Sequence, residues 1–218
     1  MSSPTLTRRW AVLRATRLIP VLRYHDADTA RYAAQVALAA GCQAIELTWT
    51  IPGVLDVLRA LRAESQSAGR AGVLLGIGTI TEACQAHEAL ESGADFLVSP
   101  GVVAELPQMA AAVDAISMVG AFTATEVIAA RDAGADVVKV FPAETGGPRH
   151  LGALKAVFED TLFCPTGGVT AANMGDYFAA GAQFVGMGSN LYDKRHLAAR
   201  DTDALVEALR QTRIAAGG

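Results

Sequence analysis

The chain has 218 residues, of which 51% are hydrophobic and 18% charged, so it can build a large core and lacks the composition of a disordered chain. Its net charge is −4 and no basic run stands out, which argues against nucleic acid as a partner. It shows neither the apolar core of a signal peptide at its start nor a stretch that could span a membrane, and its three cysteines lack CxxC spacing, so we expect a cytoplasmic protein with reduced thiols.

Short apolar runs alternate with Ala-rich segments of helical pattern. After a helical opening around residues 7–15, eight runs have the length and composition of strands. They cover residues 18–23, 44–48, 73–77, 95–98, 116–120, 136–140, 162–165 and 183–186. Asp26, Pro52 and Thr81 stand at expected helix starts. Glycines stand at the expected ends of three helices: Gly93, Gly134 and Gly181.

This alternation, with a period of roughly 20 to 30 residues, predicts a parallel α/β fold. Eight units predict a (β/α)₈ TIM barrel with an N-terminal helix. We expect a single domain over residues 1–218, because no linker or low-complexity segment divides the chain. A doubly wound open sheet is the alternative, since strand counts from sequence can miss by about one or two. No GxGxxG follows the first strand, which weakens a dinucleotide-binding interpretation.

The most informative stretch is Asp-Val-Val-Lys-Val-Phe-Pro at residues 136–142. Because side chains alternate along a strand, Val137, Lys139 and Phe141 share one face. Lysine is rarely buried without a partner or a task. Burial favours the neutral amine, which can attack a carbonyl and form a Schiff base. The alternative is a strand-end lysine whose ammonium group reaches water.

In a barrel, catalytic groups lie at the carboxyl ends of the strands. Polar residues and glycines gather at those ends: Arg23, Glu46, Thr48, Thr79, Ser99-Pro100-Gly101, Lys139, Thr166-Gly167-Gly168 and Gly188-Ser189. Glu46 and Lys139, if both point inward, would share one cavity, either as a structural ion pair or as an acid–base couple. The glycine turns after the last two strands would form the usual phosphate site of a barrel. The four histidines lack metal-ligand spacing, so we expect no metal.

Several segments together resemble the 2-keto-3-deoxy-6-phosphogluconate aldolase family, the class I pyruvate aldolases. They are Gly76-Ile77-Gly78-Thr79, Ser99-Pro100-Gly101, Lys139-Val140-Phe141-Pro142-Ala143-Glu144, Cys164-Pro165-Thr166-Gly167-Gly168-Val169 and Gly188-Ser189. The resemblance spans nearly the whole chain in the right order. It implies a (β/α)₈ barrel, a homotrimer, and a lyase of carbohydrate metabolism of the Entner–Doudoroff type that needs no cofactor.

The resemblance also implies roles for individual residues. Lys139 would be the Schiff-base lysine, and Glu46 the general acid/base that moves protons through a water. The pyruvate end and the middle of the substrate would contact four residues: Thr79, Pro100, Phe141 and Thr166. The phosphate would be held by Gly167, Gly168, Gly188 and Ser189.

One position departs from the family pattern. Members that act on the gluconate-derived substrate usually carry an arginine four residues after the glutamate, where this chain has Thr50. The 6-phosphogalactonate branch resembles this chain better, because it places an arginine after the first strand, as Arg23 stands here. Arg23 would then bind the substrate carboxylate. The alternative is an arginine at a strand end that is solvated.

The expected reaction is cleavage of a 2-keto-3-deoxy-6-phospho sugar acid, of the phosphogalactonate or phosphogluconate type, to pyruvate and glyceraldehyde 3-phosphate. Three alternatives remain open. One is an aldolase for an unphosphorylated keto acid such as 4-hydroxy-2-oxoglutarate. Another is a phosphosugar isomerase in which Lys139 is only an electrostatic partner of Glu46, and the third is a phosphate-binding protein without turnover. Neither of the last two would form an adduct that borohydride traps.

Overall fold

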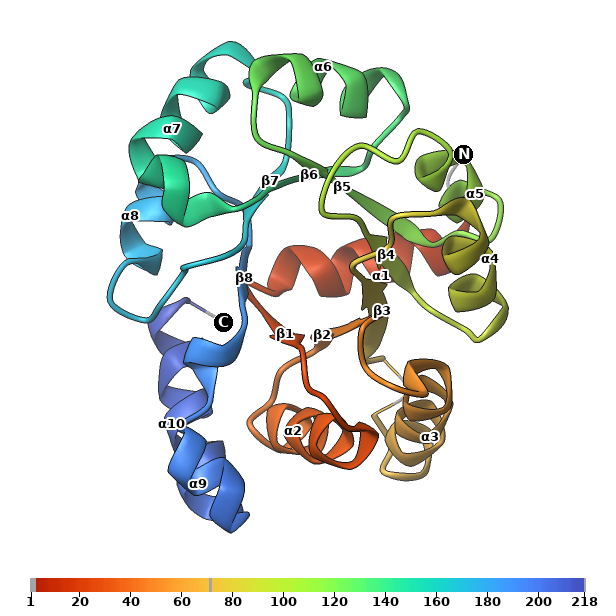
Figure 1. Cartoon of the computed structure of the whole chain (residues 1–218), viewed down its shortest axis with the longest axis vertical. Helices are drawn as coiled ribbons and strands as arrows, with labels where there is room; N and C mark the ends of the chain where they lie inside the picture. The colour runs from red at the N-terminus through yellow and green to blue at the C-terminus, as the bar shows by residue number, and fades with distance from the viewer. Residues whose placement is uncertain (1–2, 71, 218) are drawn as a thin grey trace.

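The computed structural model describes residues 3–70 and 72–217 (Figure 1). Eight parallel strands lie in the order β7-β6-β5-β4-β3-β2-β1-β8. The strands are β1 (Leu18–Leu22), β2 (Ala44–Thr48), β3 (Leu74–Gly78), β4 (Phe96–Val98), β5 (Ile116–Ala121), β6 (Val137–Val140), β7 (Phe163–Pro165) and β8 (Val185–Met187). A bridge between Thr166 and Gly186 joins the two outer strands. The predicted barrel is therefore confirmed, and the open-sheet alternative is wrong.

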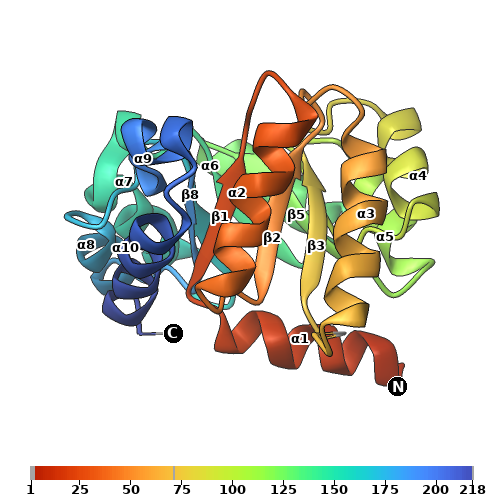
Figure 2. The same cartoon turned by 90° about the horizontal axis from the view of Figure 1, so that it is seen from below.

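Most helices surround the strands on the outside, whereas the first lies across one end of the barrel (Figures 1 and 2). The helices are α1 (Pro4–Ala15), α2 (Ala27–Ala39), α3 (Val54–Ser67), α4 (Ala83–Glu91), α5 (Leu106–Ala111), α6 (Ala124–Asp132), α7 (Ala143–Val157), α8 (Met174–Ala179), α9 (Lys194–Ala199) and α10 (Thr202–Ala215), with a 3₁₀ turn η1 (Ser189–Leu191). No helix in the described ranges is long and apolar enough to cross a membrane.

Two of the three predicted helix starts are wrong. Asp26 does cap α2, because its side chain accepts a hydrogen bond from the Thr29 N–H. The helix expected at Pro52 begins at Val54 instead. Thr81 does not cap α4, because the residue at the N-cap is Glu82, one position later. The Thr81 N–H donates to the Gln85 side chain at 2.8 Å.

Helix α1 lies across the end of the barrel from which the strands begin (Figure 2). Its Leu13 is fully buried against apolar side chains of the barrel interior. The members of this inner cluster are Leu13, Ile19, Ala44, Leu74, Phe96, Val98, Ile116, Met118, Val137, Cys164 and Phe184. Burial of this apolar surface seals the lower end of the barrel.

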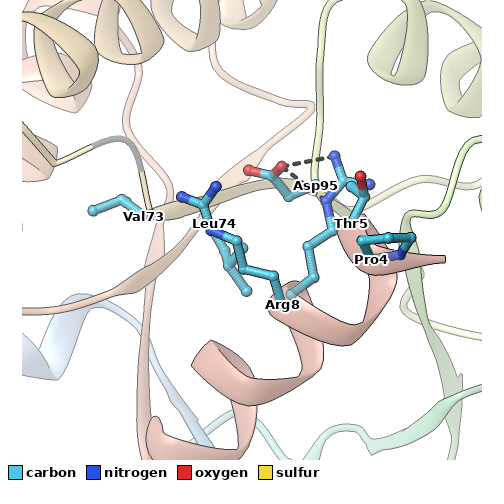
Figure 3. A pocket seen from close by; sticks show the side chains of 8 residues that line it. Pro4, Thr5, Arg8, Val73, Leu74 and Asp95 are labelled. Carbon is cyan, nitrogen blue, oxygen red and sulfur yellow. Dashed lines mark hydrogen bonds and ion pairs between the residues drawn. The ribbon is translucent and has the colours of Figure 1, made fainter. Parts of the chain in front are cut away.

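An ion-pair cluster fastens α1 to the lower end. Asp95 lies beside Thr5 and Arg8 of α1 (Figure 3). The Arg9 guanidinium lies 2.8 Å from Asp95 Oδ1, and Arg62 pairs with the other carboxylate oxygen. That oxygen also accepts the Leu75 N–H at 2.9 Å. A cavity of about 290 Å³ beside Asp95 is lined partly by Pro4, Thr5 and Arg8 of α1. Because α1 covers the end where the strands begin, this cavity is remote from their carboxyl ends.

Candidate active site

Lys139 and Glu46 point into the upper end of the barrel from β6 and β2. Lys139 Nζ lies 3.4 Å from Glu46 Oε1, and the two residues are 5% and 3% exposed. The expectation that both side chains share one space is therefore confirmed. Two opposite charges this deeply buried are stable together, whereas loss of either leaves the other desolvated and unpaired.

Glycines on neighbouring strands make room for these groups. A Cβ atom on Gly78 of β3 would lie 1.9 Å from Glu46 Oε1, and one on Gly186 of β8 would lie 2.3 Å from Thr166 Oγ1. Gly120, the strand partner of Lys139, leaves space for the backbone of Pro100 in the same way. Sequence analysis quoted Gly78 but missed this task, although alternation already places Gly76 and Gly78 on one strand face.

A cavity of about 310 Å³ opens above the lysine. It is lined by Val21, Arg23, Lys139, Phe141, Thr166, Gly167, Gly168, Val169, Gly188 and Asn190. The Phe141 ring centroid lies 5.5 Å from Lys139 Nζ. The structure thus brings together most of the residues that the sequence singled out, and adds Asn190, which follows Gly188-Ser189 in the sequence but was given no role in the site.

Three predicted residues lie beside this cavity and do not line it. Glu46 contacts the cavity only through Lys139, whose Nζ donates a hydrogen bond to Glu46 Oε1. Thr79 Oγ1 accepts a hydrogen bond from Arg23 Nη2 at 3.1 Å, and Pro100 packs its backbone against Gly120. Arg23 and Thr79, far apart in sequence, therefore act as one polar unit at the rim.

Thr79 has an unusual backbone. Its φ of +60° lies in the left-handed region, which a β-branched residue rarely adopts. Backbone hydrogen bonds hold its two neighbours: Gly78 O accepts the Trp49 N–H at 2.7 Å, and the Ile80 N–H donates to Val98 O at 3.1 Å. Such a conformation costs about 1 to 3 kcal/mol, and strain of this kind concentrates at functional sites.

Thr50 occupies the position where the family pattern has an arginine. It is exposed, and its hydroxyl lies 2.9 Å from the Thr48 hydroxyl. No cation therefore extends from this position, and Arg23 is the guanidinium that lines the cavity.

The turn after β7 directs backbone N–H groups toward the cavity. Thr166 O accepts the Ala143 N–H at 2.9 Å, and Gly167 O accepts the Glu144 N–H at 3.0 Å, so both carbonyls face α7. A trans peptide holds its N–H opposite its C=O, so the N–H groups of Gly167 and Gly168 point away from α7, on the side of the cavity that both residues line. Their φ angles of +92° and +75° suit glycine.

The turn after β8 contributes Gly188 to the same cavity. Ser189 begins the 3₁₀ turn η1, and its side chain lies outside the described part of the structure. Consecutive N–H groups that converge on one space form a binding site for an anion.

Cys164 lies next to Lys139 in the β6–β7 pairing. Burial raises the pKa of its thiol to about 12, so the group is neutral at physiological pH. The thiol therefore contributes a small apolar wall beside the amine, as expected for a buried cysteine. Within residues 3–70 and 72–217, no three His, Cys, Asp or Glu side chains group as a metal site would require.

Comparison with known proteins agrees with this geometry. The family model for KDPG and KHG aldolase matches residues 10–208. A "probable 2-dehydro-3-deoxy-6-phosphogalactonate aldolase" of Rhizobium meliloti is 35% identical over 176 residues, which cover 80% of this chain and 81% of the relative. The 2-dehydro-3-deoxy-phosphogluconate aldolase of Zymomonas mobilis is 33% identical over 168 residues, which cover 77% and 78%.

A solved structure shares the fold over nearly the whole chain. The KDPG aldolase of Legionella pneumophila, with pyruvate captured as a covalent carbinolamine intermediate, superposes with a TM-score of 0.82 at 26% identity, over 94% of this chain and 98% of that one. The family model spans most of the chain, and the relatives are aligned over most of their own length. This protein is a member of the KDPG and KHG aldolase family.

Proposed function

We propose that this protein is a class I aldolase that cleaves a 2-keto-3-deoxy-6-phospho sugar acid to pyruvate and glyceraldehyde 3-phosphate. The observation that carries the proposal is the buried Lys139–Glu46 pair at the base of a cavity whose far side presents backbone N–H groups. The names of the aldolase relatives and the captured pyruvate of the Legionella enzyme support it.

In the proposed mechanism, the Lys139 ammonium first passes a proton to Glu46 or to a water, because only the neutral amine can attack the C2 carbonyl. The same proton then leaves with the carbinolamine hydroxyl as water, which gives a protonated imine. Glu46, directly or through a water, removes the proton of the C4 hydroxyl, and the C3–C4 electron pair moves into the imine as glyceraldehyde 3-phosphate leaves. Glu46 or its water then protonates C3 of the enamine. The protonated imine is the electron sink for the cleavage step. Its hydrolysis after the protonation of C3 releases pyruvate and restores the amine.

The remaining cavity residues would position the substrate. Arg23, held by Thr79, would bind the carboxylate and thereby align the carbonyl with the amine. Pro100, Phe141 and Thr166 would contact the pyruvate end and the middle of the chain. The phosphate would lie on the N–H groups of Gly167, Gly168 and Gly188, with Ser189.

Between the two C4 epimers, we favour the phosphogalactonate type. Its support is Thr50 in place of an arginine, the guanidinium of Arg23 at the cavity, and the similarity to the Rhizobium protein. We also propose that residues 1–218 form one domain, that the protein is a homotrimer and that it is cytoplasmic. These three statements rest on the family resemblance and, for the location, on three unpaired cysteines.

The test is a steady-state assay of pyruvate release from the two phosphorylated C4 epimers and from 4-hydroxy-2-oxoglutarate. We expect the highest kcat/KM for the phosphogalactonate epimer. A higher kcat/KM for 4-hydroxy-2-oxoglutarate would contradict the proposal that the substrate is phosphorylated. Pyruvate release from none of the three compounds would contradict the proposal that the protein is an aldolase. Light scattering of the purified protein tests the trimer.

A further inference from the structure

The third peptide of the turn after β7 is held by a side chain that the proposed mechanism leaves unused. Asn173, the residue before α8, donates from Nδ2 to Gly168 O at 3.0 Å. Its Oδ1 accepts the Thr170 N–H at 2.8 Å. One carboxamide thus fixes both the carbonyl of the glycine turn and the start of the segment that leads into α8.

The orientation of the Gly168–Val169 peptide follows from this contact. Because the Gly168 carbonyl faces Asn173, the N–H of Val169 points to the opposite side. Val169 is 1% exposed and lines the cavity with Gly167 and Gly168. Among the described residues, no acceptor takes up the Val169 N–H.

We propose that Asn173 is a positioning residue that turns the Val169 N–H into the cavity, so that the turn after β7 gives the substrate's phosphate a third backbone donor beside Gly167 and Gly168. Three successive carbonyls are then turned away from the anion, two by the start of α7 and the third by Asn173. Each reversal presents one N–H to the phosphate, and donors that are fixed in advance bind without a cost of reorganisation. The inference rests on the proposed function.

Asparagine suits this position because it carries a donor and an acceptor on one planar group. Aspartate has nearly the same shape and keeps an acceptor for Thr170, but it cannot donate to Gly168 O. Serine is neutral and too short to span the distance. Both residues are favoured at the start of a helix, so α8 should form in either variant.

The experiment compares N173D and N173S with the unmodified protein in the condensation direction. Pyruvate is supplied with D-glyceraldehyde 3-phosphate or with unphosphorylated D-glyceraldehyde. We expect both variants to raise KM for the phosphorylated aldehyde about 10-fold to 100-fold, the loss expected for one hydrogen bond to a charged group. The kinetics with D-glyceraldehyde should not change, and neither should deuterium exchange into the methyl group of pyruvate.

The control is T170A. It removes the hydroxyl that accepts the backbone N–H of Asn173 at 3.3 Å, and it leaves the bond from Asn173 Nδ2 to Gly168 O in place. It should leave KM for the phosphorylated aldehyde unchanged. If KM for the phosphorylated aldehyde rises equally in T170A, the loop is merely loosened, and if it rises in N173D alone, only the charge matters. Each of these results would overturn the inference. Equal effects with both aldehydes, or no rise in KM at all, would also overturn it.

Failure of the proposed function looks different. If the unmodified protein neither exchanges the methyl protons of pyruvate nor condenses pyruvate with either aldehyde, the aldolase assignment fails before Asn173 is tested. If the unmodified protein does both and the Asn173 variants match it, only the role of Asn173 is wrong.

Discussion

The two ends of the barrel interior differ in the residues that line them. The lower end is filled with apolar side chains such as Phe96, Ile116 and Phe184, and α1 covers it. The upper end combines a buried ion pair with inward glycines and a residue in the left-handed region. The same eight strands therefore carry a close-packed core at one end and a polar, partly hollow site at the other.

The lower end therefore mainly stabilises the fold, and the upper end mainly serves the reaction. Large apolar side chains at the lower end stabilise the barrel through burial, and Arg9 and Arg62 pair with the buried Asp95 carboxylate. At the upper end, desolvated charges and strain are retained at a cost in free energy of unfolding. Substitutions at the lower end should change stability alone, and those at the upper end should change activity first.

The largest effect is expected for E46Q. Glutamine keeps the size of the side chain but cannot accept the C4 hydroxyl proton, so kcat should fall about 10²-fold to 10⁴-fold. Lys139 should still form a pyruvate adduct that borohydride traps, because the amine is intact. Cleavage kinetics and mass mapping on the same sample check both points. Retention of wild-type kcat would show that Glu46 is only a structural partner.

L13A probes the lower end. Leu13 is fully buried where α1 meets the barrel, so its truncation should lower the free energy of unfolding by about 2 to 5 kcal/mol. Urea denaturation measures this loss. At a temperature where the variant remains folded, kcat and KM should match those of the unmodified protein. A large fall in kcat of the folded variant would contradict the separation of the two ends.

G78A tests the space that the upper end reserves for Glu46. The added methyl group would occupy the position of the carboxylate, so Glu46 must move, and a shift of about 1 Å can cost roughly 10²-fold in kcat. The matched control is G101A, because a Cβ on Gly101 meets no atom within 4 Å and its φ is not positive. Equal kinetics for the two variants would refute the role of Gly78.

The smallest effect is expected for T79G, which should stabilise the fold but weaken substrate binding. Glycine relieves the strain of the left-handed conformation, which should stabilise the fold by about 1 kcal/mol after its greater unfolded entropy is counted. Loss of the hydroxyl that binds Arg23 should raise KM for the substrate. T79S keeps the hydroxyl, so it should match the unmodified protein in KM. A T79G variant with lowered stability would contradict the strain argument.

The barrel could be predicted from its eight strand–helix units, and most of the site from period-two alternation together with the segments that resemble the family. Alternation places Glu46 and Lys139 on inward faces, and parallel strands end at the same edge. The starts of α3 and α4 could not be predicted from capping residues, because Gly53 and Glu82 stand at the two N-caps and neither makes a side-chain cap hydrogen bond.

The tasks of Gly78 and Asn173 depend on contacts that only folding creates. Gly78 matters because another strand sends Glu46 against it, and Asn173 because the turn brings Gly168 O within reach. The spacing Thr170-Ala-Ala-Asn173 before a helix offered a weak capping signal for the second of these. For the first, alternation placed Gly76 and Gly78 on one strand face, but it did not show which side chain fills the space beside them.

The most direct test of the central claim is borohydride reduction with pyruvate, followed by peptide mass mapping. The chain has three lysines, so Lys155 and Lys194 serve as internal controls. Lys155 already donates to the carbonyls of Glu159 and Thr161 at the protein surface. We predict a reduced pyruvate adduct on Lys139 alone. A folded sample without an adduct, or with one on either of the other lysines, would contradict the Schiff-base mechanism.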